Sequence, residues 1–320
     1  MITVNHLYKT YRSPLKGSNF FADLVNRQFK KIPALDDISF SINDTELVGF
    51  IGPNGAGKTT TLKILSGILY PTSGEVNVMG FKPFEKKPAF LREISFIMGQ
   101  RNQLLWDLPA SDTFELNKEV YGVPDHQYKN MISSLSDLLK CGDLIEKPVK
   151  SLSLGERMKM ELIAGLLHKP KVIFFDEPTI GLDIFSQTAV REFIQTYQKE
   201  FKSTIMLTSH YLEDVKRLAS RLIIIDHGHI LYDGSLAEIL EKYSRVKKVT
   251  VILDKPINLT EAKGIATPVF FSPMRISYNI ARTELPESIK KISKNLPISD
   301  MTVEDESIED IIKTFFAEKT

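Results

Sequence analysis

The chain has 320 residues, a formal net charge of +1, 42% hydrophobic residues and 25% charged residues. This length predicts two domains of ordinary globular composition. The balanced charge offers no basic footprint for nucleic acid, and no apolar run approaches the roughly 18–20 residues of a membrane-spanning helix. A lone cysteine, Cys141, excludes a disulfide framework.

The first part of the chain is predicted to alternate strands and turns around a glycine-rich segment. Apolar alternation favours strands over residues 2–7 and 34–42, and a compact apolar run favours a buried strand over residues 46–51. A helix is expected over residues 59–66, closed by Gly67, and a further strand over residues 75–79 after a turn. The amino terminus lacks the apolar stretch of a signal segment.

The glycine-rich segment reads GPNGAGKTT and fits the pattern G-x-x-x-x-G-K-[ST] between a strand and a helix. Glycines allow the backbone to aim several N–H groups at phosphates, and the opening helix adds its positive dipole end. In such a loop Lys58 would reach the β- and γ-phosphates, and the Thr59 hydroxyl would ligate Mg²⁺. The predicted phosphate-binding residues are Gly52, Pro53, Asn54, Gly55, Ala56, Gly57, Lys58, Thr59 and Thr60.

An acidic strand end follows further along the chain, after a region of helical periodicity over residues 103–150. The apolar run over residues 171–175 is typical of a strand buried on both faces of a parallel sheet, and it ends in Asp176 and Glu177. Ligands bind at this end of such strands. Asp176 is therefore expected to hold Mg²⁺ and Glu177 to polarise the attacking water; the alternative is an acidic strand end that only caps a loop.

Upstream of that strand, SLSLGE over residues 151–156 precedes a predicted helix over residues 157–167. The order of these motifs resembles that of the ATP-binding cassette (ABC) ATPases over roughly residues 1–240. The resemblance implies an α/β P-loop NTPase of ABC type, with a RecA-like core sheet, an antiparallel β subdomain and a helical insertion. It places an ABC ATPase domain over residues 1–244, and residues 245–320 are left as a small α+β accessory domain.

The resemblance also assigns roles to residues outside the phosphate loop. Tyr11 matches the aromatic residue that stacks on adenine, with Tyr8 as the near alternative. Gln100, with Gln103 close by, matches the glutamine that joins Mg²⁺ to the helical insertion. The residues matching the signature, the D-loop and the switch histidine are Leu152, Ser153, Leu154, Gly155, Glu156, Asp183 and His210.

Two signature residues depart from the commonest form, Leu-Ser-Gly-Gly-Gln, because Leu154 replaces a glycine and Glu156 replaces the glutamine. A positive φ at Leu154 would carry a steric cost, which puts the turnover rate in doubt. The rest of the segment looks like the branch of the family that serves exporters of drugs, lipids and polysaccharides.

The resemblance implies a homodimer with two composite ATP sites, because the signature of one subunit closes over the nucleotide of the other. A separate integral membrane permease is the expected partner at the cytoplasmic face of the cell membrane. Candidates for its docking groove are Trp106, Leu108 and Phe114, for each of which packing in the buried core is the alternative. No nucleic acid partner is expected. The alternative is a soluble ABC-type ATPase that acts on ribosomes or DNA.

An inserted segment over residues 13–33 shows helical spacing of its apolar side chains, with Lys30 and Lys31 on the opposite face and Pro33 as a stop. The hypothesis is a basic amphipathic helix that lies beneath the permease or touches lipid headgroups; a helix packed on its own cassette is the alternative. Strands are predicted in the accessory domain over residues 248–253, 268–271 and 275–280, and helices over residues 284–296 and 305–316.

Overall fold

The computed structural model describes residues 1–14, 29–209, 211–243, 246–306 and 308–319. The chain divides into two compact units, Met1–Gly234 and Ser235–Thr320. This division falls before the domain boundary expected after residue 244. Helix α9 (Leu236–Tyr243) belongs with the second unit because its Tyr243 ring packs edge-on against Phe315 of helix α12 (Ile308–Lys319).

The first unit is built on a sheet with the strand order β5-β6-β7-β3-β8-β9. The neighbours from β5 to β8 pair in parallel. Every residue of β3 is buried, as expected for a strand covered on both faces. The strands are β3 (Leu47–Ile51), β5 (Ile94–Met98), β6 (Val172–Asp176), β7 (Thr204–Thr208), β8 (Arg221–Asp226) and β9 (His229–Ser235).

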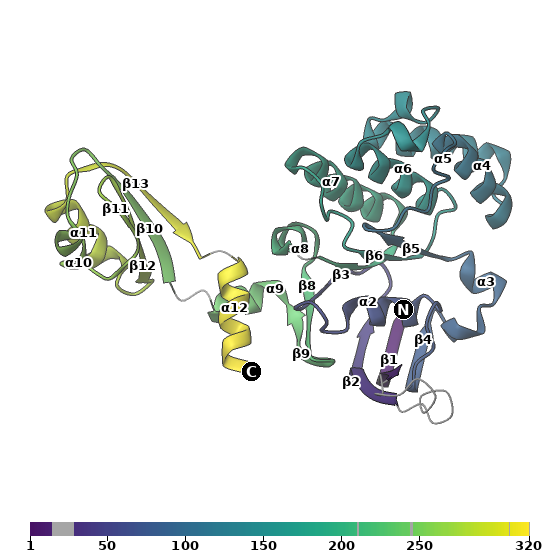
Figure 1. Cartoon of the computed structure of the whole chain (residues 1–320), viewed down its shortest axis with the longest axis horizontal. Coiled ribbons are helices and arrows are strands. Elements are labelled where there is room, and N and C mark those ends of the chain that lie inside the picture. Colours follow the sequence, from purple (N-terminus) through teal and green to yellow (C-terminus); the bar gives the residue numbers. More distant parts are fainter. Residues whose placement is uncertain (15–28, 210, 244–245, 307, 320) are drawn as a thin grey trace, which may run out of the picture. The chain divides into compact units, whose positions relative to one another are not determined.

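Helices cover this sheet and connect its strands (Figure 1). The helices α2 (Lys58–Leu65), α7 (Ile184–Phe201) and α8 (Leu212–Leu218) follow β3, β6 and β7 in the chain. Between β5 and β6 the chain forms a helical subdomain of α4 (Ala110–Tyr121), α5 (Asp125–Leu139) and α6 (Leu154–Leu166), joined by single turns at Gly142–Leu144 and Val149–Ser151. The loops that follow the parallel strands therefore meet at one edge of the sheet.

A second, antiparallel sheet has the order β2-β1-β4, with β1 (Ile2–Pro14), β2 (Phe29–Ile42) and β4 (Ser73–Val78). It shares a hydrophobic core with the main sheet, and the Phe40 and Phe50 ring centroids lie 5.9 Å apart. Between β4 and β5 the chain forms a 3₁₀ turn at Pro83–Glu85 and the short helix α3 (Pro88–Leu91). The α/β fold with a parallel core sheet, an antiparallel β subdomain and a helical insertion is thus the predicted one.

The helix predicted over residues 13–33 is wrong where the structure describes the chain. Residues 29–33 belong to β2, where Ile32 pairs with Tyr11 and Lys31 with Arg12. Backbone pairing with β1 replaces the helical hydrogen bonds, and Pro33, expected to stop a helix, is tolerated because β2 is an edge strand. The rest of that predicted helix, over residues 15–28, lies outside the described residues.

The second unit contains the antiparallel sheet β11-β12-β10-β13. Its elements follow the order β10 (Val246–Leu253), α10 (Leu259–Lys263), β11 (Pro268–Ser272), β12 (Arg275–Ala281), α11 (Leu285–Asn295) and β13 (Ile298–Asp305). This is a split β-α-β arrangement with the helices on one face. Strand β13 was not predicted, because its polar residues alternate with only Ile298, Met301 and Val303. No helix in the described ranges is long and apolar enough to span a bilayer.

Candidate functional site

The phosphate loop joins β3 to α2 in a conformation that needs glycine. Gly55 and Gly57 have φ angles of 82° and 113°. A Cβ at Gly57 would lie 2.6 Å from Leu35 Cδ2 and 2.8 Å from the Ala34 carbonyl oxygen, so a side chain is excluded there. Gly57 is also the N-cap of α2, and no side chain caps this helix. The first turn of α2 therefore directs backbone N–H groups into the space that a phosphate would fill.

Lys58 is buried at the base of this loop. Its Nζ donates hydrogen bonds to the carbonyl oxygens of Gly52 at 2.7 Å and Pro53 at 3.0 Å. Burial lowers the pKa of Lys58, an effect opposed by the negative charges of Glu177 and Asp176. The lysine charge is thus directed at the loop, with two carboxylates close enough to favour it.

Asp176, at the end of β6, joins the phosphate loop to the neighbouring strand. Its Oδ1 accepts hydrogen bonds from Thr59 Oγ1 at 3.0 Å and from Thr208 Oγ1 at 2.7 Å. The sequence prediction brought Thr59 and Asp176 together, but it overlooked Thr208. Thr208 could have been predicted from its sequence position, because it is a hydroxyl residue at the end of β7, the strand next to β6.

Glu177 has a left-handed backbone, with φ at 57°. Its N–H donates to the Thr208 carbonyl and hydroxyl oxygens, both at 3.1 Å. A Cβ at Gly99 would lie only 2.0 Å from the Glu177 carbonyl oxygen, so Gly99 allows this close approach. A non-glycine residue held in this conformation is often found at active sites, where the surrounding structure maintains the strain.

These groups surround a hollow of about 290 Å³. Tyr11 forms part of its wall, and its hydroxyl lies 3.3 Å from Thr60 Oγ1. Tyr8 does not line the hollow; desolvation and the hydrogen-bonded Asp37 carboxylate raise its pKa. The geometry favours Tyr11 over Tyr8. The lining residues are Tyr11, Ala34, Asn54, Gly55, Gly57, Lys58, Thr59, Thr60 and Glu177.

The two candidate glutamines differ in their surroundings. Gln100 is exposed just beyond β5 and does not line the hollow. The Gln103 side chain is already engaged, because its Nε2 donates to the Phe96 carbonyl oxygen at 3.0 Å. Gln100 is therefore the freer of the two to turn toward a ligand. The predicted switch residue, His210, lies outside the described residues.

The predicted signature residues form the start of helix α6. Ser153 is the N-cap and forms a capping box with Glu156: the Glu156 carboxylate accepts from Ser153 N at 2.9 Å, and Ser153 Oγ accepts from Glu156 N at 3.3 Å. The hydrogen bond from the Ser153 backbone is the main reason that the pKa of Glu156 is lowered. Leu154 opens the helix without a positive φ, so the predicted backbone cost does not arise.

The predicted signature residues lie against the predicted D-loop of the same chain. A Cβ at Gly155 would come within 2.2 Å of Ser186 Oγ, which donates to Asp183 Oδ2 at 2.6 Å. Asp183 also accepts from Phe185 N and Ser186 N as the N-cap of α7. The hydrogen bond from the Ser186 hydroxyl is the main reason that the pKa of Asp183 is lowered, and the backbone hydrogen bonds add to it. Leu152 precedes this contact as the C-cap of the turn Val149–Ser151.

A buried network next to the site was also missed. Asp214 in α8 accepts hydrogen bonds from Arg191 Nε at 2.5 Å, from Ser209 Oγ at 2.7 Å and from the Thr179 hydroxyl. It ties the segment after Glu177 to the residue that precedes His210. Two acidic residues in the first turn of α8, Glu213 and Asp214, were the sequence feature that could have predicted this network.

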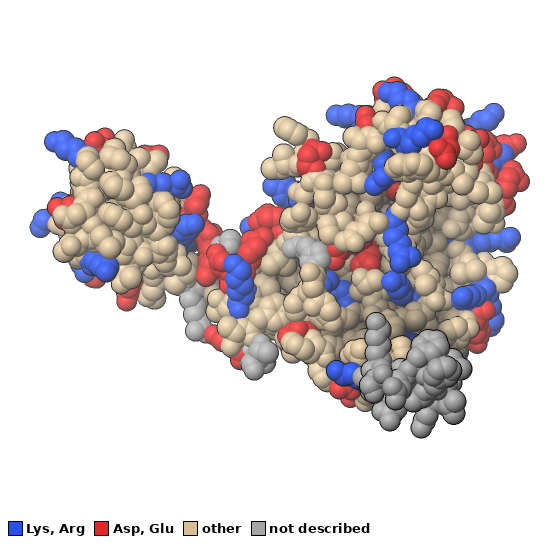
Figure 2. Space-filling model, viewed as in Figure 1, with Lys and Arg blue, Asp and Glu red and all other residues tan. Residues whose placement is uncertain are grey.

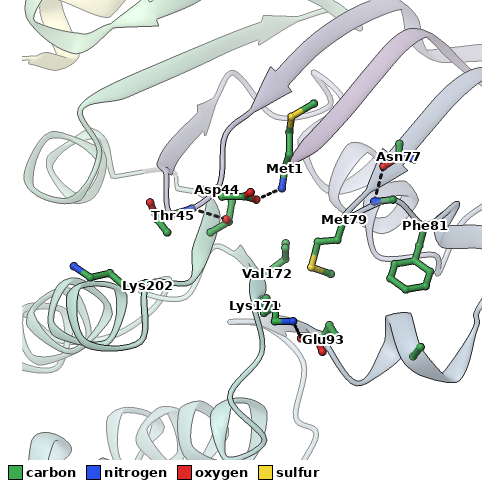
Figure 3. Close-up of a pocket in the computed structure, with 13 residues that line it drawn as sticks. Met1, Asp44, Thr45, Asn77, Met79, Phe81, Glu93, Lys171, Val172 and Lys202 are labelled. Carbon is green, nitrogen blue, oxygen red and sulfur yellow. Dashed lines mark hydrogen bonds and ion pairs between the residues drawn. The ribbon is translucent and has the colours of Figure 1, made fainter.

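A wider cavity, of about 660 Å³, lies at the opposite edge of the sheet (Figure 3). It is lined by Val172 and Thr204, the first residues of β6 and β7. Lys171 pairs with Glu93 at 3.2 Å on its wall. Because the glycine-rich loop and Glu177 follow the carboxyl ends of their strands, this cavity is separate from the candidate nucleotide site.

Comparison with known proteins gives this site a family. The profile of a family described as "ABC transporter" matches residues 35–180. The chain is 35% identical to "ABC transporter ATP-binding protein NatA" of Bacillus subtilis over 66% of this chain and 86% of that protein. It is 33% identical to "Doxorubicin resistance ATP-binding protein DrrA" of Mycobacterium tuberculosis over 65% of this chain and 62% of that protein.

A solved structure described as a dimeric, post-hydrolysis state of an ATP-binding cassette bound to ADP and Pi has the same fold. It matches with a TM-score of 0.62 and 21% identity over 74% of this chain and 99% of that chain. The chain therefore belongs to the ABC transporter ATP-binding proteins, a family of ATPases.

Proposed function

We propose that two copies of this chain enclose two ATP molecules and that their closure and opening drive export through a separate membrane permease. The observation behind this proposal is that the nucleotide hollow is incomplete. None of the signature residues 152–156, all of them described, lines it. Ser153 and Leu154 are exposed at the start of α6 instead, ready to meet the nucleotide of a second copy. The dimeric cassette bound to ADP and Pi supports this arrangement.

The residues around Asp176 fit a magnesium ion. Thr59 Oγ1 and Asp176 Oδ1 are hard oxygen donors 3.0 Å apart. Two neighbouring ligands of an octahedral Mg²⁺, each at about 2.1 Å, are separated by ~3 Å. Thr59 and Asp176 would hold the ion, with Gln100 completing the set from the loop after β5. A magnesium ion held there would supply positive charge to neutralise the charge that develops on the phosphate during transfer.

The reaction follows from the positions of the protein groups. Lys58 would exchange its hydrogen bonds with the loop carbonyls for the β- and γ-phosphates, and the N–H groups at the start of α2 would hold the phosphate chain. Glu177 would orient and polarise the attacking water from the hollow wall. Loss of phosphate removes the contacts between the copies, so each nucleotide state favours a different arrangement.

The surface proposed to receive the permease lies on the helical subdomain. Trp106 and Leu108 are 48% and 44% exposed, whereas Phe114 is fully buried and belongs to the core. Leu116 and Val120 on α4 are also exposed apolar side chains of this subdomain. Export, rather than import, is supported by the drug-resistance relative. Such a complex would hold the chain at the cytoplasmic face of the membrane.

Copurification tests this function. An affinity-tagged chain, extracted from its native membranes in mild detergent, is expected to bring down a polytopic membrane protein in stoichiometric amount. Recovery of ribosomes or DNA without a membrane protein would contradict the proposal and favour a soluble ABC-type ATPase. The face in Figure 2 intersperses acidic and basic side chains among its described residues, which favours the first outcome.

A further inference from the structure

The loop that follows β5 is fastened at its beginning to the acidic end of β6. Gly99 N donates to the Asp176 carbonyl oxygen at 3.0 Å. The Cα of Gly99 packs so closely on the Glu177 carbonyl that no Cβ fits between them. Gln100 comes next in the chain. A shift of the backbone at Asp176 and Glu177 would therefore move Gln100 and the residues after it.

The same loop is fastened further on to helix α6, which begins with the signature. Gln103 N donates to Glu161 Oε1 at 2.8 Å. One turn earlier on the same helix face, the Arg157 guanidinium lies 5.6 Å from the centre of the Trp106 ring. The loop thus connects the hydrolysis site to the signature helix through contacts at both of its ends.

Glu161 is an unusual residue for its position. Its side chain is 5% exposed, and its helix neighbours Met160 and Leu162 are fully buried. Burial raises the pKa of Glu161. Hydrogen bonds from the backbone N–H groups of Gln103 and Leu104 lower it, and the positive charge of Arg157 lowers it least. A leucine would fill this place without the desolvation that a carboxylate suffers. The hydrogen bonds that Glu161 accepts from backbone N–H groups therefore explain why a carboxylate occupies this buried position.

We propose that Glu161 is a positioning residue that transmits the state of one nucleotide site to the signature that completes the other. This inference rests on the proposed dimer. When the segment after β5 moves at one site, the hydrogen bond from Gln103 N to Glu161 moves α6, and with it Ser153 and Gly155. Since that signature faces the partner's nucleotide, Glu161 makes the two sites cooperative.

Two substitutions separate positioning from packing. Glu161→Gln keeps an acceptor oxygen for Gln103 N, whereas Glu161→Leu keeps the volume and removes the acceptor. The purified full chain is assayed for ATP hydrolysis over a range of ATP concentrations, with melting temperature and ATP-dependent pairing measured in parallel. We expect Glu161→Leu to lower kcat about tenfold, as for the loss of one hydrogen bond to a charged group, with KM within about twofold of the parent.

The Hill coefficient gives the most specific readout. The parent and Glu161→Gln are expected to show a value above 1, and Glu161→Leu a value near 1 at an undiminished melting temperature. Parental kcat and Hill coefficient in Glu161→Leu would overturn the inference, as would equal losses in both variants with lowered melting temperatures. A parent that hydrolyses ATP without pairing would instead overturn the proposed dimer.

Discussion

Helices α2 and α6 both begin at the proposed ATP site, yet their first turns are satisfied in opposite ways. The N-cap of α2 is Gly57 in a left-handed conformation, and no side chain caps the helix. The N-cap of α6 is Ser153, which shares a complete capping box with Glu156. The first N–H groups of α2 are thus left for a ligand, whereas the start of α6 is satisfied by side chains of its own helix.

This contrast agrees with the different tasks proposed for the two ends. A phosphate loop must hold nucleotide within one copy, so its N–H groups and Lys58 are directed into the hollow. A signature must remain ordered while the copies are apart, and it must then exchange part of its own capping for the partner's nucleotide. In the proposed dimer, one chain would therefore bind the nucleotide, whereas closure over it would require two.

The largest effect is expected from removing the charge at α2. Lys58→Ala should lower kcat by about 100-fold or more, because a preorganised donor to the phosphates is lost. Folding should not suffer, since burial already lowers the pKa of this lysine. Lys63→Ala, in the last turn of the same helix, is the matched control. Steady-state ATPase assays measure both variants. Equal kcat values for Lys58→Ala and Lys63→Ala would contradict the role proposed for the start of α2.

A smaller effect, on stability rather than on rate, is expected within α6. Burial raises the pKa of Glu161 to about 7 from its ordinary 4.5. The folded state therefore holds this proton more firmly than the unfolded state, and the associated stability is present below pH 4.5 and lost as the pH rises through 7. Glu161→Gln should gain stability relative to the parent over this range, by about 3 kcal/mol at most.

Urea unfolding at acid and at mildly alkaline pH measures that gain. The difference in free energy of unfolding between Glu161→Gln and the parent should grow as the pH rises. The same difference at both ends of the range would show that the Glu161 carboxyl does not titrate with a raised pKa.

The smallest effect is expected at the capping box itself. Glu156→Gln restores the commoner signature residue and retains an acceptor for Ser153 N, but it removes a negative charge from the place proposed for the partner's γ-phosphate. We expect the KM for ATP to fall about two- to threefold, within the range of a charge near a helix end. Raising the salt concentration should reduce the difference between variant and parent. An unchanged KM at low salt would show that Glu156 does not lie close to the nucleotide of the partner.

How much could be predicted from the sequence depended on how local each signal was. The strand before the phosphate loop, the loop itself and the acidic end of β6 are each a run of consecutive residues. Each could be recognised in the sequence, and their order along the chain predicted the fold. Thr208 and Glu161 were missed, because their importance arises from hydrogen bonds to residues distant in the chain, Asp176 and Gln103. The pattern around Phe29 and Ile32 misled, since pairing with β1 overrides helical spacing there.

The central claim, that two copies close on ATP, is tested most directly by the solution mass of Glu177→Gln. This substitution should stop hydrolysis while leaving Lys58, Thr59 and Asp176 to bind ATP and Mg²⁺. Light scattering coupled to size exclusion should then give twice the mass of the 36.3 kDa chain with ATP and Mg²⁺, and a single chain with ADP. A variant that binds ATP, fails to hydrolyse it and still elutes as a single chain would contradict the account.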